Sequence, residues 1–207
     1  ALDSKTRKIG SVSRKQLKME NTPNVLSIDT DYIKSPVHFN NVVDFFLNYI
    51  DNLDINNIIF SQAHVNIFYT LDPICRKKQS INLVNIDHHH DIWYQEVPLN
   101  SFNSSNWLGY YLNKKDFIDN IYWLANYDSD RNNHQDLITI TYDIKDIKFK
   151  KFDYVFVCNS PNYSNLLSET AFETLINIVK HVKKCKKFDF FKPNLVNHFS
   201  KNILIND

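Results

Sequence analysis

The fold is decided by residues 81–91, which read Ile81-Asn82-Leu83-Val84-Asn85-Ile86-Asp87-His88-His89-His90-Asp91. A short, largely apolar run of this kind is typical of a buried strand. It runs directly into metal-donor side chains at alternate positions. Because a strand has a side-chain period of two, Asp87, His89 and Asp91 face one way if the chain stays extended. The stretch therefore predicts a buried strand with a metal site at its carboxyl end.

Two further strands are predicted to deliver donors to the same place. Residues 25–28 form a short strand that leads to Asp29 and Asp31, and residues 57–60 form another that leads to His64. Parallel sheets bind ligands outside the carboxyl ends of their strands, so we expect one shared crevice. Oxygen and imidazole donors without thiolate suit a hard or borderline divalent ion such as manganese. The predicted metal ligands are Asp29, Asp31, His64, Asp87, His89 and Asp91.

Each of these residues also has an ordinary structural explanation. A single Asp after a strand is usually a turn or helix-cap residue, and a single His is more often buried or in a loop than bound to metal. The grouping favours the metal site, because two buried carboxylates are costly unless a cation compensates them. Of His88 and His90, we expect one to pack below the site and the other to lie near the substrate. His90 and Asp91 are the candidate catalytic residues.

With these motifs in place, the chain resembles the ureohydrolase (arginase-like) superfamily. Sites of that superfamily combine a single His, an Asp-x-His-x-Asp strand end and an Asp-x-Asp strand end around two manganese ions. The chain is most similar to the peptide arginases, the maturation enzymes of ribosomally made peptide natural products. Three further stretches carry that similarity: Ser-Ile-Asp-x-Asp-Tyr at 27–32, Asn-Trp at 106–107, and a late strand at 154–158 followed by Asn-Ser-Pro-Asn-Tyr.

The resemblance implies two Mn²⁺ ions and a precursor peptide whose arginine residues become ornithine with release of urea. It implies that one ion is held by His64, Asp87, Asp91 and Asp29, and the other by Asp87, His89, Asp29 and Asp31. Asn106 and Ser160 become the candidate substrate-binding residues. Both also have local explanations, since Asn106 precedes a predicted helix as an N-cap would and Ser160 lies in a Ser-Pro-Asn turn.

The chain departs from the arginase pattern in two places. Its Asp-x-Asp motif precedes the other metal motifs, whereas arginases place it last, so the resemblance implies a permuted motif order. The glutamate with which arginases bind the guanidinium has no counterpart near Ser160. The first departure leaves the metal site intact, and the second leaves the substrate-binding residue open.

Charge favours a cationic substrate independently of the resemblance. Four carboxylates offset two divalent cations, and paired metals lower the pKa of a bound water toward neutrality. With the resulting hydroxide the centre carries about one negative charge. The arginine guanidinium stays protonated in proteins and can approach such a centre as a cation. Asp91 is the candidate to carry the proton to the leaving amine.

Several other functions fit the same motifs. The chain could be a ureohydrolase acting on free arginine or agmatine, or a zinc amide hydrolase of the deacetylase kind. It could also be a non-catalytic peptide-binding protein with the same fold. Metal content distinguishes the non-catalytic protein from the enzymes, because six buried ligands without bound ions would destabilise the fold.

Composition limits the remaining classes. With 207 residues and 43% hydrophobic content, the chain is large enough for one domain with a sizeable core. Its two glycines exclude a glycine-rich phosphate loop. Three cysteines without CxxC spacing favour a reducing cytoplasm, and no apolar stretch is long enough for a membrane span.

The first 18 residues differ from the remainder in charge. They hold six Lys or Arg and one Asp, a charge of about +5, whereas residues 19–207 hold 18 basic and 22 acidic residues. We expect residues 1–18 to be a basic tail, leader or tag remnant, and residues 19–207 to form a single catalytic domain. The mildly acidic body predicts no nucleic-acid partner.

Strand and helix patterns alternate along the body. Amphipathic helices are predicted at 37–53, 65–77 with an interruption at Pro73, 107–115 and 164–184, and further strands at 121–125 and 137–141. This alternation predicts an α/β protein, a three-layer α/β/α sandwich with a mainly parallel sheet. Asp143 and Asp146 are rejected as metal ligands, because their spacing does not match alternate strand positions.

Overall fold

The computed structural model describes residues 22–92, 102–130 and 137–184. Its centre is a sheet of six strands in the order β2-β6-β1-β3-β4-β5, and every pair of neighbouring strands is parallel. The strands are β1 Asn24–Asp29, β2 Ile58–Ser61, β3 Ile81–Ile86, β4 Ile118–Leu124, β5 Thr139–Thr141 and β6 Tyr154–Cys158. The four α-helices of the described part are α2 Pro36–Ile50, α3 Phe68–Arg76, α4 Trp107–Leu112 and α5 Leu166–Val182.

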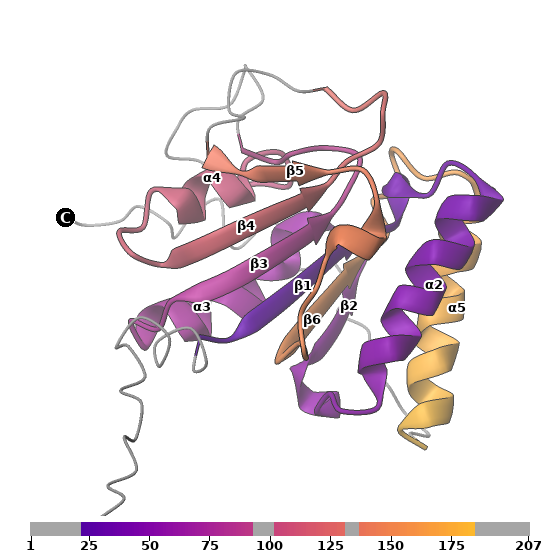
Figure 1. Ribbon diagram of the computed structural model, residues 1–207, viewed down its shortest axis with the longest axis horizontal. Coiled ribbons are helices and arrows are strands. Elements are labelled where there is room, and N and C mark those ends of the chain that lie inside the picture. The colour runs from indigo at the N-terminus through magenta and orange to yellow at the C-terminus, as the bar shows by residue number, and fades with distance from the viewer. Residues whose placement is uncertain (1–21, 93–101, 131–136, 185–207) are drawn as a thin grey trace, which may run out of the picture.

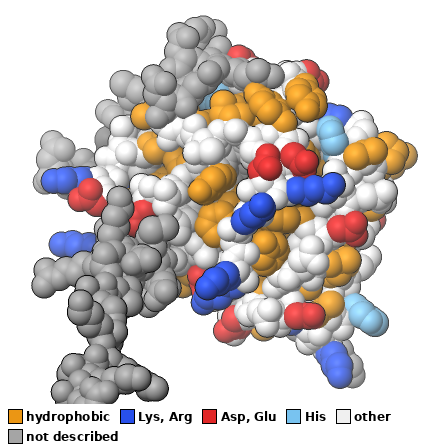
Figure 2. All heavy atoms as spheres, viewed as in Figure 1, with side chains coloured by type: hydrophobic (Ala, Val, Ile, Leu, Met, Phe, Trp, Pro, Cys, Tyr) orange, Lys and Arg blue, Asp and Glu red, His pale blue; other side chains and the backbone are white. Residues whose placement is uncertain are grey.

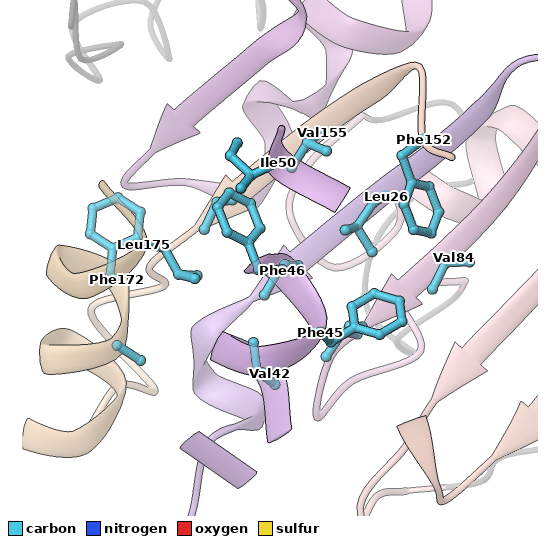
Figure 3. Packing of buried hydrophobic residues seen from close by; sticks show 14 of the residues in the cluster. Leu26, Val42, Phe45, Phe46, Ile50, Val84, Phe152, Val155, Phe172 and Leu175 are labelled. Carbon is cyan, nitrogen blue, oxygen red and sulfur yellow. The ribbon is translucent and has the colours of Figure 1, made fainter. Parts of the chain in front are cut away.

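Helices cover both faces of the sheet, α2 and α5 on one side and α3 and α4 on the other (Figure 1). Successive residues of β1 pack into different clusters: Leu26 belongs to the cluster with α2 and α5, and Val25 to the cluster with α3 and α4. Figure 3 shows side chains of α2, α5 and the sheet that meet in the first cluster. The predicted three-layer α/β/α sandwich with a parallel sheet is confirmed.

The two long helices begin at side-chain caps. Ser35 caps α2 by accepting a hydrogen bond from the backbone N–H of His38, and Pro36 occupies the first helical position, where its missing N–H costs nothing. Val42, Phe46 and Ile50 then recur every four residues and are buried against the sheet. Asn165 caps α5 in the same way.

The helix α3 departs from the sequence prediction, because it continues through Pro73 instead of being interrupted there. A proline inside a helix costs about 3 kcal/mol. Leu71 and Ile74 on either side of it are buried under the sheet, and this packing outweighs the lost backbone hydrogen bond. The predicted interruption at Pro73 is therefore wrong.

Four short 3-10 helices complete the described elements: η1 Thr30–Tyr32, η2 Ile55–Asn57, η3 His64–Ile67 and η5 Ile144–Asp146. Asp143 caps η5 through Lys145 N, and Asp146 accepts a hydrogen bond from the Thr141 hydroxyl. Both carboxylates therefore serve local turns, in keeping with their rejection as metal ligands.

The order of the strands reverses at β1. The chain passes from β1 through α2 to β2, which lies beyond β6, and returns through α3 to β3 on the other side of β1. At such a switch point the connections leave toward opposite faces, and a crevice opens at the carboxyl edge of the sheet. The predicted metal ligands follow the strands that meet here.

The opposite edge of the sheet is tied by side-chain amides. Asn120 Nδ2 donates to Asn82 Oδ1 at 2.7 Å, and Asn82 Nδ2 donates to Asn24 Oδ1 at 2.9 Å. Asn24 and Asn82 are also register partners in β1 and β3. This amide ladder links β1, β3 and β4 at their amino ends.

The chain surface mixes charges of both signs, as the net charge of +1 implies. On the face seen in Figure 2, basic and acidic side chains are interspersed with hydrophobic ones. Within the described ranges no helix has the length and apolar character needed to cross a bilayer. The predicted tail at 1–18 and Cys185 lie outside the described residues.

Candidate metal centre

A cavity of about 240 Å³ opens at the carboxyl edge of the sheet. Its floor is built by residues at the ends of β1 and β3 and by the segment after β2. Its wall comes from the segment before α4 and the turn after β6. The residues that line it are Asp29, His64, Asp87, His89, Asp91, Ser104, Ser105, Ser160 and Tyr163.

The first group of donors surrounds one nitrogen of His64. His64 Nδ1 lies 3.4 Å from Asp29 Oδ2, 3.3 Å from Asp87 Oδ2 and 3.0 Å from Asp91 Oδ2. All four side chains are buried. Donor atoms of Asp29, His64 and Asp87 lie close enough together to hold one metal ion.

A second group shares Asp87 with the first. His89 Nδ1 lies 3.0 Å from Asp31 Oδ2 and 3.7 Å from Asp87 Oδ1. These three residues form another group that could hold a metal ion. Asp87 therefore presents Oδ2 to one group and Oδ1 to the other, as expected of a bridging carboxylate. All six predicted ligands are brought together.

The charges of the site fit a cationic occupant. Four buried carboxylates face two imidazoles, so the group is electrically unbalanced unless protons or cations are bound. Burial and the neighbouring carboxylates raise the pKa of Asp31 to about 7, and burial with Asp91 raises that of Asp87 to about 7. Metal ions would replace these protons.

Burial lowers the pKa of the two histidines, whereas it raises the pKa of the carboxylates. Burial alone lowers the pKa of His64, but the hydrogen bonds that its ring donates to Asp29, Asp87 and Asp91 outweigh burial, so the pKa lies well above its usual value. Burial likewise opposes the charge of His89, yet its pKa is raised to about 9 by Asp31. Burial raises the pKa of Asp29, but the hydrogen bonds that it accepts from His64 and Ser160 outweigh burial. The pKa of Asp29 therefore lies below its usual value.

The backbone brings the ligands together by turning, not by remaining extended. After Asp29 the chain enters η1, and Asp31 N donates to Asp29 Oδ1 at 3.2 Å. After Asp87 the strand has ended, and Asp91 adopts a left-handed conformation with φ of 52°. Asp tolerates this region better than most residues. Asp87, His89 and Asp91 line one cavity, but they do not meet at a single point, because His89 joins Asp31 and Asp87 while Asp91 contacts His64. The extended alternation from which their convergence was predicted is wrong.

Ser27 orients His64 from below. Its hydroxyl lies 2.9 Å from His64 Nε2, and both side chains are buried. If Nδ1 faces a metal ion, Nε2 carries the ring proton and donates it to Ser27 Oγ. The ring is also stacked on Phe156, with 5.7 Å between centroids and 8° between planes.

Asp91 is fixed by α4. Trp107 Nε1 donates to Asp91 Oδ2 at 2.6 Å, and the Asp91 carbonyl accepts from Leu108 N at 3.0 Å and Gly109 N at 3.3 Å. An indole N–H can only donate, so the Asp91 carboxylate is the acceptor of this bond. The helix therefore holds both the backbone and the side chain of Asp91.

Ser160 lies at the cavity as predicted, where it contacts Asp29. Its hydroxyl donates to Asp29 Oδ2 at 2.5 Å, and its backbone N–H lies 3.4 Å from Asp29 Oδ1. These contacts join the turn after β6 to the end of β1. A contact with substrate at Ser160 stays a prediction.

His90 and Asn106 do not line the cavity. The His90 ring is buried beside Trp123, with 5.8 Å between ring centroids, and its Nδ1 accepts from Ile92 N. Asn106 is fully buried, and its Oδ1 accepts from Asn103 N at 2.9 Å. The prediction that His90 is catalytic and the prediction that Asn106 binds substrate remain untested. The buried positions of both side chains away from the cavity do not favour either role.

Sequence reasoning does not assign Ser27 or Trp107 to the site, and it makes Tyr163 only a weak candidate beside Ser160. Ser27 and Trp107 were noted only as parts of the family motifs, and the periodicity of a strand or helix does not reveal a contact such as Trp107 with Asp91. A buried Ser two residues before a metal-binding Asp is the one signal that could have identified Ser27, because it lies on the same side of the strand.

Comparison with protein-family models, with curated proteins and with solved structures finds no match to this chain. The site is therefore interpreted from its own residues. Their geometry establishes a buried group of Asp and His side chains, at the carboxyl edge of a parallel sheet, that could hold metal.

Proposed function

We propose that the protein is a binuclear manganese hydrolase that converts arginine residues of a peptide to ornithine and releases urea. One observation carries the proposal: two groups of Asp and His donors share Asp87 at the base of one cavity. A shared carboxylate between two groups of donors is suited to a pair of ions. The resemblance of the motifs to those of peptide arginases supplies the substrate.

The donor set suits manganese. Four carboxylates and two imidazoles, without thiolate, favour a hard or borderline divalent ion over structural zinc. Asp29, His64, Asp87 and Asp91 would hold one ion, and Asp31 and His89 would complete the other with Asp29 and Asp87. When bound, a pair of such ions would supply Lewis acidity and lower the pKa of a bound water toward neutrality.

The reaction requires one water and no other reactant. The water oxygen bonds to the guanidinium carbon, and the bond from that carbon to the side-chain nitrogen breaks. The products are urea and the ammonium group of ornithine, so atoms and charge balance. The carboxylates of the site attract the cationic guanidinium toward the reacting position.

Asp91 is the residue to move the proton. Trp107 and His64 both lie against its Oδ2, at 2.6 Å and 3.0 Å, and this leaves Oδ1 for the cavity. From there Asp91 would take a proton from the attacking water and pass it to the departing nitrogen. Because α4 fixes the carboxylate, little reorganisation is needed between the two transfers.

The cavity has room for an arginine side chain. Its volume is about 240 Å³, slightly below the range of about 300–1,000 Å³ that is usual for small-molecule pockets. A single extended side chain fits such a space while the rest of a peptide remains outside. Free arginine or agmatine fits it as well, so the choice of a peptide substrate rests on the resemblance to the peptide arginases.

Metal analysis of the purified protein, followed by a urea assay with added manganese, tests the proposal. Arginine-containing peptides, free arginine and agmatine are compared. Two manganese ions per chain and urea from peptides alone are the expected result. Urea from free arginine or agmatine would instead identify an ordinary ureohydrolase. A metal-free, inactive protein would favour a non-catalytic peptide-binding protein.

Two substitutions connect the assay to the site. Asp29→Asn and Asp91→Asn should abolish urea release and leave the fold intact. Asp143→Asn is the matched control, because Asp143 caps η5 and Asn is an equally good cap. Full turnover by either site variant would contradict the proposal.

A further inference from the structure

Within the described part of the chain, the wall of the cavity presents no carboxylate besides the proposed metal ligands. Outside the proposed metal ligands, its described lining consists of the hydroxyl side chains Ser104, Ser105 and Ser160 and the aromatic side chain Tyr163. None of these four is a carboxylate. Among the described residues, hydroxyl oxygens and an aromatic ring are therefore the groups beside the proposed metal ligands that can contact a cationic side chain in the cavity.

Toward a ligand in the cavity, the hydroxyl of Ser160 can only accept a hydrogen bond. Its proton is donated to Asp29 Oδ2 at 2.5 Å, and Cys158 Sγ lies 3.5 Å from the same oxygen, so a lone pair remains for a ligand. An N–H-rich ligand suits it, and a guanidinium carries five N–H donors. Ser104 differs, because its oxygen accepts from Val65 N at 3.2 Å and its own proton is available to donate.

Tyr163 is the one aromatic side chain in the described lining. Its ring centroid lies 5.0 Å from that of His89, at an angle of 61° between the planes. The side chain is 60% exposed, so much of the ring stays uncovered at the cavity. A turn fixes its backbone, since Tyr163 N donates to Ser160 O at 3.0 Å and Ser164 Oγ donates to the same carbonyl at 2.9 Å.

We propose that Tyr163 determines the specificity of the site, by presenting its ring to the planar cation of the substrate while Ser160 Oγ accepts one of its N–H groups. Planar cations stack on aromatic faces, and the attraction grows as water is excluded. The identity of the cation as an arginine side chain rests on the proposed function. The recognition of a cation beside His89 rests on the lining itself.

A binding measurement tests this assignment separately from turnover. The probes are a short fluorescent peptide with one arginine and the same peptide with citrulline, which has a similar shape and no charge. Binding to the manganese-loaded protein is followed by stopped-flow fluorescence within the first turnover. The variants are Tyr163→Leu and Tyr163→Phe. Tyr127→Leu is the matched control, because Tyr127 is 82% exposed and does not line the cavity.

We expect the affinity to fall for the charged arginine peptide and not for the uncharged citrulline peptide. Tyr163→Leu should weaken binding of the arginine peptide by roughly 3- to 30-fold and leave the citrulline peptide within about twofold. Tyr163→Phe should keep the preference, and Tyr127→Leu should change neither peptide. Equal weakening of both peptides by Tyr163→Leu, or no weakening, would overturn the assignment.

The two proposals fail in different ways. Urea release by the natural protein together with an unchanged arginine preference in Tyr163→Leu would refute the assignment of Tyr163 alone. A charge preference that depends on Tyr163, in a protein that releases no urea, would refute the hydrolase and keep the cation site.

Discussion

The indole of Trp107 lies closer to the Asp91 carboxylate than the His64 ring does, and the effect of its hydrogen bond can be measured. Trp107→Phe removes the N–H that donates at 2.6 Å to Asp91 Oδ2. We expect metal affinity to fall about 10- to 100-fold, the usual effect of losing a hydrogen bond to a ligand. Isothermal titration with manganese measures the affinity, and circular dichroism verifies that the fold is kept.

A second tryptophan provides the control for that experiment. Trp123 is equally buried, but its indole donates at 2.9 Å to the backbone carbonyl of Asp87. Trp123→Phe removes the same atoms without touching a carboxylate. An equal loss of affinity in both variants would show that packing, and not the bond to Asp91, matters.

Protons and metal ions compete for the same side chains. Asp31 and Asp87 have pKa values of about 7, and His89 has a pKa of about 9, all above the usual values. A pKa raised in the folded state stabilises the fold at low pH, and this contribution is lost as pH rises through the raised value. We therefore expect the metal-free protein to lose stability as pH rises from about 4 to about 9. Asp31 and Asp87 lose their contribution between the usual value of 3.8 and about 7, and His89 loses its contribution between 6.5 and about 9.

Metal binding should reverse that dependence. Because bound protons must leave first, manganese affinity should increase over the same pH interval. Urea unfolding at several pH values, with and without manganese, measures both effects. A metal-free protein that gains stability from pH 7 to pH 9 would show that the site does not hold these protons.

Residue types were predicted well at the site, and their orientation was not. The donors could be read from the ends of three strands, because Asp and His soon after an apolar run are uncommon in such number. The left-handed turn at Asp91 and the bond to Trp107 depend on tertiary packing between β3 and α4. Local patterns carry no signal for either.

Among the elements, α5 depends on one residue that joins it to the segment after η1. Asn165 Oδ1 accepts from Leu167 N at 2.8 Å and Ser168 N at 3.0 Å, and its Nδ2 donates to Ile33 O at 3.2 Å. Asn165→Ala loses the cap and the donor. We expect the free energy of unfolding to fall by about 1–2 kcal/mol, as measured by urea denaturation.

The charged isostere separates the two contributions. Asn165→Asp keeps the capping oxygen and loses only the N–H that reaches Ile33, so its loss should be smaller than that of Asn165→Ala. Equal losses would mean that the cap contributes nothing and the bond to Ile33 contributes everything.

Elements with strong periodicity were predicted most closely. The helix predicted at 37–53 is found at Pro36–Ile50, and that predicted at 164–184 is found at Leu166–Val182. The strand predicted at 121–125 begins earlier, at Ile118, because its first residues pair with Ile81 and Asn82 of β3. Pairing partners decide where such a strand starts, and its own sequence does not name them.

At the scale of the whole molecule, Cys158 reports on opening of the sheet. It is fully buried, and burial together with the charge of Asp29 raises its pKa well above the usual value. In a Cys75→Ser, Cys185→Ser background, we expect its reaction with a thiol reagent to require unfolding. The labelling rate should increase with denaturant in parallel with the unfolded fraction.

Cys75 provides the comparison, because it is only partly buried. In a background that retains Cys75 alone, labelling should proceed from the folded protein and respond little to low denaturant. Rapid labelling of Cys158 without denaturant would show that the edge of the sheet near the metal site opens locally.

The order of the strands could not be predicted from the sequence. The alternation of elements indicated a parallel sheet, but β6, the last strand, inserts between β2 and β1. That insertion creates the bond between Ser160 and Asp29, which are 131 residues apart. Contacts across such a separation follow from the whole topology and not from any local pattern.

The amide ladder has a consequence for recognising other chains of this kind. β1 reads Asn-Val-Leu-Ser-Ile-Asp from Asn24, and β3 reads Asn-Leu-Val-Asn-Ile-Asp from Asn82. With the two asparagines paired, Asp29 and Asp87 stand at the same height, five residues further along each strand. One inserted or deleted residue in either strand would shift its carboxylate by about 3.3 Å and turn it to the other face. The paired spacing Asn-x-x-x-Ile-Asp should therefore persist in distant relatives after most other identities have been lost, and it offers a signature with which to search for them.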